Sequence, residues 1–125
     1  MILDTNALTA LAARDPAIIA KLEAADSLAF SFICVAEFQY GLLGSNRPEA
    51  GHELLRIMST RIPTLYPDSS TSDHYAAIAH DLKRRGRPIP QNDIWTAALS
   101  RQHQLPVVSR DRHFDFVTGI ERVSW

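Results

Sequence analysis

The chain has 125 residues, of which 46% are hydrophobic and 22% are charged, and its formal net charge at pH 7 is −1. A chain of this length and composition forms one domain with its own core, so we expect a single domain over residues 1–125. The small net charge excludes a strong general attraction to nucleic acid or anionic membranes. A chain with this net charge can still carry local basic patches.

Cysteine content and hydropathy define the expected compartment. Cys34 is the only cysteine, so a disulfide framework within the chain is excluded. No apolar run approaches the roughly 18 residues of a membrane span, and the N-terminus lacks a basic region followed by an apolar stretch. We therefore expect a cytoplasmic protein with no membrane segment.

Short apolar runs alternate with helical patterns in the first half of the chain. Asp15 and Pro16 are typical of a helix cap followed by the first helical residue. The predicted elements are a strand at 2–3, helices at 5–13 and 16–25, a strand at 27–31, helices at 33–43 and 46–59, and a strand at 62–66.

The second half continues this alternation. Tyr75, Ile78 and Leu82 recur at helical spacing after Ser72, and Gly86 ends the helix. The remaining predicted elements are a helix at 92–103, a strand at 106–109, a short helical turn near residue 113 and a strand at 120–123. Strands separated by helices predict an α/β fold with a central parallel sheet flanked by helices.

Four acidic residues lie near the junctions of these elements. Asp4 directly follows the first strand, and Asp111 comes three residues after Val108. Glu37 lies on the helix after the second strand, and Asp93 lies in the first turn of the helix before the fourth strand. Because parallel α/β sheets form their sites beyond the carboxyl ends of the strands, we expect these acids at one edge of the sheet.

Each acid also has a purely structural interpretation. Asp4 is placed to cap the helix after it, and Glu37 to pair with an arginine or cap a loop. Asp93 suits a helix N-terminus, and Asp111 suits a turn. Taken together, however, four converging carboxylates repel one another, and a divalent cation removes that conflict.

Oxygen ligands suit Mg²⁺ or Mn²⁺. Such an ion polarises a phosphoryl oxygen and lowers the pKa of an attacking water, so the acids indicate phosphoryl chemistry. Polar residues near the same edge are candidates for orienting the carboxylates, with helix capping as the alternative. They are Thr5, Asn6, Ser31, Asn92 and Ser109.

These motifs resemble those of the PIN-domain ribonucleases, and most closely the VapC-type toxins of bacterial and archaeal toxin–antitoxin pairs. The matching pieces run in order along the whole chain. They are Asp4-Thr5-Asn6, VAEFQYG around Glu37, IPQNDIWTAAL around Asp93 and VVSRDRHFDF around Asp111.

The resemblance implies Mg²⁺- or Mn²⁺-dependent endonucleolytic cleavage of RNA, leaving a 5′-phosphate and a 3′-hydroxyl. The family's acids fall on Asp4, Glu37 and Asp93, with Asp111 as a fourth, while Asp115 matches a position that is acidic in only some members. Ser109 stands where relatives often carry threonine. The resemblance further implies a homodimer and inhibition by a small VapB-like antitoxin, whose C-terminal segment inserts over the acidic groove.

An acidic groove needs basic residues to receive RNA. Arg84, Arg85 and Arg87 form the densest basic run, and Arg110 and Arg112 flank Asp111 in sequence. We expect these arginines to contact phosphates, which positions RNA without reading its bases. The alternatives are a solvated helix end and pairing with the acids of the site.

Two other functions compete with the ribonuclease hypothesis. A phosphohydrolase with Asp4 as nucleophile usually needs a second acid two residues later, where this chain has Asn6. A non-catalytic PIN-like module that binds RNA or a protein partner is the second alternative, and the intact set of acids argues against it. Neither a GxSxG motif nor HExxH is present, which disfavours a serine hydrolase and a zinc peptidase.

Overall fold

Five short strands form one sheet at the centre of the computed structural model, which describes residues 1–125. The strands are β1 (Ile2–Leu3), β2 (Ala29–Ser31), β3 (Thr64–Leu65), β4 (Val107–Val108) and β5 (Arg122–Val123). Their order is β3-β2-β1-β4-β5, and every neighbouring pair is parallel. The predicted α/β class with a central parallel sheet is confirmed.

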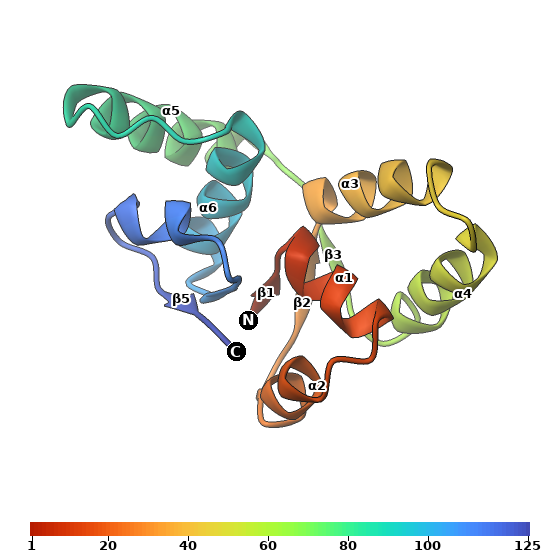
Figure 1. Ribbon diagram of the computed structural model, residues 1–125. Helices are drawn as coiled ribbons and strands as arrows, with labels where there is room; N and C mark the ends of the chain where they lie inside the picture. The colour runs from red at the N-terminus through yellow and green to blue at the C-terminus, as the bar shows by residue number, and fades with distance from the viewer.

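Six α-helices connect and cover the strands. They are α1 (Thr5–Ala12), α2 (Pro16–Glu23), α3 (Phe32–Leu43), α4 (Pro48–Met58), α5 (Ser69–Arg84) and α6 (Gln91–His103), and a 3₁₀ helix, η1, spans Arg112–Phe116. Helices α1 to α4 lie together on one side of the molecule, and α5 and α6 lie on the other (Figure 1). No helix combines the length and the apolar character needed to cross a membrane.

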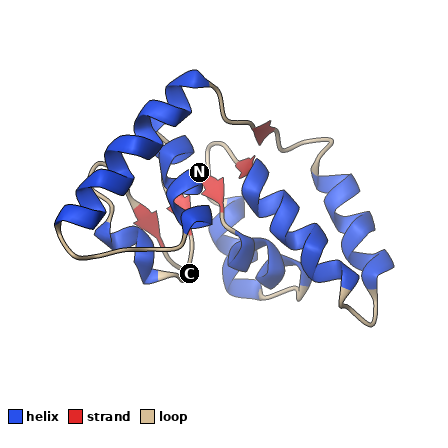
Figure 2. Cartoon of the chain, turned by 90° about the horizontal axis from the view of Figure 1, so that it is seen from above, coloured by secondary structure: helices blue, strands red, loops and turns tan.

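Alternation along the strands explains why both faces of the sheet are covered. Leu3, Phe30 and Val108 join the core formed with α1 to α4. The residue before each of them points to the opposite face, as the pleat requires. Ile2 and Ala29 pack against α6 there, and Val107 packs in the core of α5 and α6. The strands thus lie between two layers of helices, as Figure 2 shows from above.

Local capping decides where several helices begin. Asp15 caps α2 by accepting a hydrogen bond from Ala17 N at 2.9 Å, with Pro16 as the first helical residue, as predicted. Helix α5 begins at Ser69, three residues before the predicted Ser72. Asp68 and Thr71 form a reciprocal capping box there, which satisfies amides that the helix itself cannot.

The register of the sheet places the ends of three strands at one level. Leu3 pairs with Phe30 on one side and with Val108 on the other. Because these strands are parallel, the residues directly after Leu3, Phe30 and Val108 emerge at the same edge. Those residues are Asp4, Ser31 and Ser109.

Candidate active site

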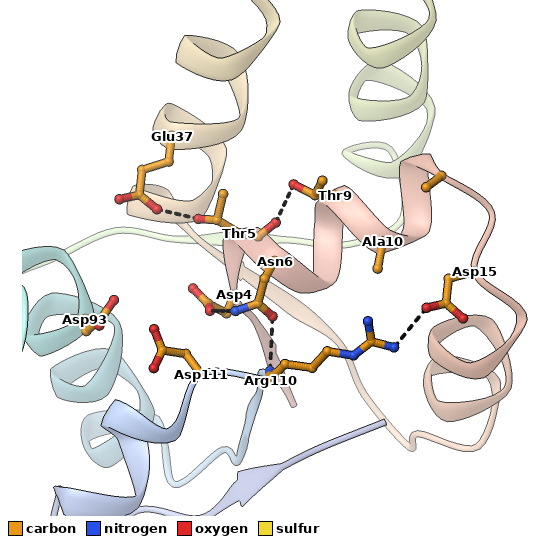
Figure 3. A pocket seen from close by; sticks show the side chains of 11 residues that line it. Asp4, Thr5, Asn6, Thr9, Ala10, Asp15, Glu37, Asp93, Arg110 and Asp111 are labelled. Carbon is orange, nitrogen blue, oxygen red and sulfur yellow. Dashed lines mark hydrogen bonds and ion pairs between the residues drawn. The ribbon is translucent and has the colours of Figure 1, made fainter.

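A pocket of about 620 Å³ opens at this edge of the sheet. Its lining includes all four of the predicted acids, which come from the end of β1, from α3, from α6 and from the loop after β4 (Figure 3). They are Asp4, Glu37, Asp93 and Asp111. The structure therefore brings together four carboxylates that are separated by up to 107 positions in sequence.

Asp4 is the most deeply placed acid of the pocket, with only 8% of the residue exposed. It occupies the N-cap position of α1, but its side chain makes no capping hydrogen bond. Its Oδ2 instead accepts hydrogen bonds from Asn6 Nδ2 at 2.6 Å and from Ser109 Oγ at 2.8 Å. Burial raises the pKa of Asp4, and the charges of Glu37 and Asp111 raise it further, while the Ser109 bond offsets part of the rise.

Glu37 is fixed by two neutral side chains. The Thr5 hydroxyl donates to Oε2, and Asn92 Nδ2 donates to Oε1 at 2.5 Å. Thr5 opens α1 and Asn92 lies in the first turn of α6, so three helices meet at this carboxylate. No arginine salt bridge holds Glu37, which was the alternative interpretation of this residue.

Asp93 and Asp111 face each other across His113. His113 Nδ1 lies 3.1 Å from Asp93 Oδ2 and 3.1 Å from Asp111 Oδ1. Burial raises the pKa of Asp93 to about 6; the negative charges of Asp4 and Asp111 add to the rise, and the His113 hydrogen bond opposes it. Asp111 also accepts from His113 N at 2.9 Å, so it forms the predicted turn and lines the pocket as well.

The predicted orienting residues occupy different places around the acids. Thr5 and Asn6 line the pocket itself. Ser109 is completely buried beneath it and bonds to both Asp4 and Asn6. Ser31 lies outside the pocket, where its Oγ caps α3 by accepting from Cys34 N at 3.0 Å and lies 3.2 Å from Thr96 Oγ1.

Arg110 is the one predicted arginine that lines the acidic pocket. Its guanidinium reaches Asp15 Oδ2 at 2.9 Å, and it lies 4.6 Å above the ring centre of Trp125. Its backbone N–H donates to Asn6 Oδ1 at 3.2 Å. These contacts hold a positive charge at the rim of a negative pocket (Figure 3).

The other charged candidates lie outside that pocket. Arg85 pairs with Asp81 at 2.7 Å and donates to the carbonyl of Phe116, and Arg87 lies over the Phe116 ring. Asp115 pairs with Arg122 at 2.6 Å, a contact that lowers the pKa of Asp115. Arg84 and Arg112 are exposed residues that do not line the pocket either.

The donor set fits a divalent cation. Burial is the main cause of the raised pKa values of Asp4 and Asp93, and the charges of neighbouring carboxylates raise both further. One ligand atom from each of Asp93, Asp111 and His113 lies within 4.8 Å of the others. A hard dication relieves this repulsion, because it replaces carboxylate–carboxylate contacts with attraction to a central charge.

A comparison with protein-family models shows which family these features belong to. The model of the PIN domain matches residues 1–119. The chain belongs to the PIN-domain family. The matched PIN domain spans nearly the whole chain and contains all four acids of the pocket.

Three relatives extend this assignment. The PIN domain is 32% identical to Ribonuclease VapC1 of Haemophilus influenzae, over 98% of this chain and 96% of the relative. It superposes on the structure of VapBC-1 from nontypeable H. influenzae with a TM-score of 0.86 and 28% identity, covering 99% and 96% of the two chains. The chain also superposes on VapBC-5 from Mycobacterium tuberculosis, a member of the VapBC family of toxin-antitoxin systems. The TM-score is 0.79 and the sequence identity is 25%, over 99% of this chain and 97% of that chain.

His113 is the residue whose position sequence reasoning undervalued. In sequence it lies two residues after Asp111, and the five histidines of the chain do not have the spacing of a zinc site. The structure brings it against Asp93 as well, which lies 20 positions earlier. The available signal was the Asp-x-His spacing at the start of a helical turn, where the Asp caps the turn and the His follows on it.

Proposed function

We propose that this chain is a metal-dependent endoribonuclease and the toxin component of a type II toxin–antitoxin pair. The observation that carries the proposal is the convergence of four carboxylates on one pocket at the carboxyl edge of a PIN-domain sheet. The near full-length similarity to Ribonuclease VapC1 supports RNA as the substrate.

The four acids are the proposed ligands of Mg²⁺ or Mn²⁺. A bound ion of this kind supplies polarisation of a phosphoryl oxygen and a lower pKa for an attacking water. The protein's part is to hold the carboxylates in fixed orientations before substrate arrives. Asn6 and Ser109 do this for Asp4, and Thr5 and Asn92 do it for Glu37.

Arg110 is the proposed phosphate contact at the rim of the pocket. Its guanidinium is positioned by Asp15 and by the face of Trp125. An RNA phosphate entering the acidic pocket gains a cation beside it, which offsets part of the repulsion from the carboxylates. The contact positions the backbone and carries no base specificity.

Replacing single acids tests the catalytic assignment. Asp4→Asn and Asp93→Asn keep side-chain size and remove the charge, so we expect each to lower RNA cleavage by at least about 100-fold and to abolish growth arrest. Excess chelator should stop the wild-type reaction, and Mg²⁺ or Mn²⁺ should restore it. Cleavage that persists in both variants would overturn the catalytic assignment of these acids. Full activity in excess chelator would show that cleavage does not depend on a metal ion. Wild-type protein that binds RNA without cutting it would instead identify a non-catalytic module.

A second groove, lined by both apolar and polar residues, lies beside the acidic pocket and is the proposed site of the antitoxin. It lies between α1, α3 and α4, and its apolar lining includes Leu11, Phe38, Leu42 and Leu54. Thr5, Thr9 and Glu37 line both cavities, so the groove leads directly to the acids. An antitoxin segment with apolar side chains can occupy the groove while its end covers the metal ligands. Co-purification of the chain with a short peptide encoded by a neighbouring gene tests this partner.

We further propose that the toxin is a homodimer that acts in the cytoplasm. Light scattering should give twice the 14.0 kDa of one chain, and the monomer mass at micromolar concentration would contradict the dimer. An RNA substrate supports the cytoplasmic location, which fractionation of the native cells would test.

A further inference from the structure

A nitrogen donor stands among the carboxylates of the pocket. His113 Nδ1 lies 3.1 Å from Asp93 Oδ2 and 3.1 Å from Asp111 Oδ1, and these side chains form the one group of His, Cys, Asp and Glu in the structure with metal-ligand spacing. The other two acids, Asp4 and Glu37, are engaged by neutral polar side chains instead.

The two equal contacts of His113 are hard to satisfy with hydrogen bonds alone. A ring nitrogen carries at most one proton, which can make one strong hydrogen bond but not two. When Nδ1 carries no proton, three lone pairs converge. Neighbouring ligands of an octahedral ion with bonds of about 2.1 Å lie about 3.0 Å apart. The two 3.1 Å separations therefore suit three donors that share one cation.

Local structure holds His113 in this position. It lies in the first turn of η1, and its backbone N–H donates to Asp111 Oδ1 at 2.9 Å. The next residue, Phe114, is 1% exposed in the core under α5 and α6, which anchors the turn. The His113 side chain is 40% exposed, so solvent can reach the ring and hydrate an ion held there.

We propose that His113 is a direct ligand of the catalytic ion, together with Asp93 and Asp111, and that it makes this site favour Mn²⁺ over Mg²⁺. This inference rests on the proposed function. Mg²⁺ is a hard ion that binds oxygen and retains water, whereas first-row transition ions from Mn²⁺ onward accept imidazole nitrogen more readily. A ligand set of two carboxylates and one imidazole thus discriminates between Mn²⁺ and Mg²⁺ better than a set of four carboxylates does.

Pulsed electron paramagnetic resonance on the Mn²⁺-loaded protein tests the bond directly. A bound imidazole gives a nitrogen hyperfine coupling to the manganese. We expect it in the wild type and in His103→Gln, which alters an exposed histidine at the end of α6, and its loss in His113→Gln. Labelling the histidines of the wild type with ¹⁵N should shift the coupling, which identifies imidazole without any substitution.

Isothermal titration calorimetry tests the selectivity. We expect His113→Gln to weaken Mn²⁺ binding by at least about tenfold and Mg²⁺ binding by less than about threefold, with no change in His103→Gln. A nitrogen coupling that persists in His113→Gln, or equal losses for the two ions, would overturn the role of His113. Asp93→Asn separates the two levels of inference. If it leaves Mn²⁺ binding intact, the acidic site itself is wrong; if it abolishes binding while wild-type Mn²⁺ shows no nitrogen coupling, only the role of His113 fails.

Discussion

Ser109 shows how much a single small residue contributes to this site. Its hydroxyl donates to Asp4 Oδ2, accepts from Asn6 Nδ2 at 2.9 Å and accepts from Asp111 N at 2.9 Å. One buried oxygen thereby connects the end of β1, the first turn of α1 and the turn before η1. The predicted role in orienting carboxylates remains a prediction, and these three bonds are its physical basis.

Ser109→Ala should damage both activity and stability. The change leaves a buried carboxylate and two N–H donors short of a partner, which costs about 1–3 kcal/mol of unfolding free energy. Loss of orientation at Asp4 should lower the cleavage rate by about 10- to 100-fold. Denaturant unfolding and a cleavage assay measure the two effects. Ser109→Thr is the matched control because it keeps the hydroxyl; equal losses in both variants would show that packing matters rather than the hydrogen bonds.

Arg110→Gln should weaken RNA binding in a salt-dependent manner. Removing one phosphate contact reduces the slope of log affinity against log salt concentration by about one. Binding is best measured by fluorescence anisotropy in an Asp93→Asn background, where the RNA stays uncut. Arg61→Gln removes the same charge from an exposed residue after α4 and serves as the control. An unchanged slope in Arg110→Gln would show that Arg110 does not contact an RNA phosphate.

At the scale of elements, hydrophobic pattern and punctuation were sufficient to predict the type and order of every helix and strand. Two strands are shorter than predicted: β2 begins at Ala29 and not at residue 27, and β4 spans Val107–Val108 and not residues 106–109. The start of α5 was misplaced because its capping box uses Asp68 and Thr71 in place of the more usual Ser or Thr with Glu.

Contacts between elements were less predictable than the elements themselves. That acids at strand ends meet at one edge follows from parallel topology, so the positions of Asp4 and Asp111 were accessible from sequence. The direction in which a long side chain points could not be predicted from the sequence. Arg85 and Arg110 are both basic residues near a predicted acid, yet one reaches Asp81 and the other lines the pocket, a difference set by helix phase and tertiary packing.

The groove between α1, α3 and α4 gives a prediction at this scale. Ala50 is an exposed residue of α4 that lines the groove, so Ala50→Trp should fill it without disturbing the core. We expect antitoxin affinity to fall by at least about tenfold, since a bulky group occupies the docking space, while RNA cleavage by the free toxin is retained. Surface plasmon resonance with the cognate antitoxin measures this. His52→Trp places the same side chain on an exposed position of α4 outside the groove; equal weakening in both variants would argue against docking there.

For the whole molecule, the topology that creates the site also brings carboxylates close together and partly buries them. The strand order places β1 at the centre, with β2 and β4 on either side, so acids from the full length of the chain meet beside Asp4. In the absence of a cation, the folded state holds Asp93 with a pKa of about 6, above the 3.8 of a free aspartate. Proton binding is therefore linked to folding.

The metal-free protein should accordingly lose stability as the pH rises. A carboxyl whose pKa is raised by folding favours the folded state fully below about pH 4, and this contribution disappears as the pH passes about 6; the difference is about 2 kcal/mol. Thermal unfolding in chelator from about pH 4 to about pH 7 measures it, with Asp93→Asn as the control because its amide cannot titrate. We expect the wild type to lose stability relative to Asp93→Asn across this range and to regain it at about pH 7 when Mg²⁺ or Mn²⁺ is added, since an ion that binds only the folded state stabilises it. Parallel pH profiles for the two proteins would show that Asp93 is not held at a raised pKa, and the electrostatic case for a cation at this edge of the sheet would lose its strongest support.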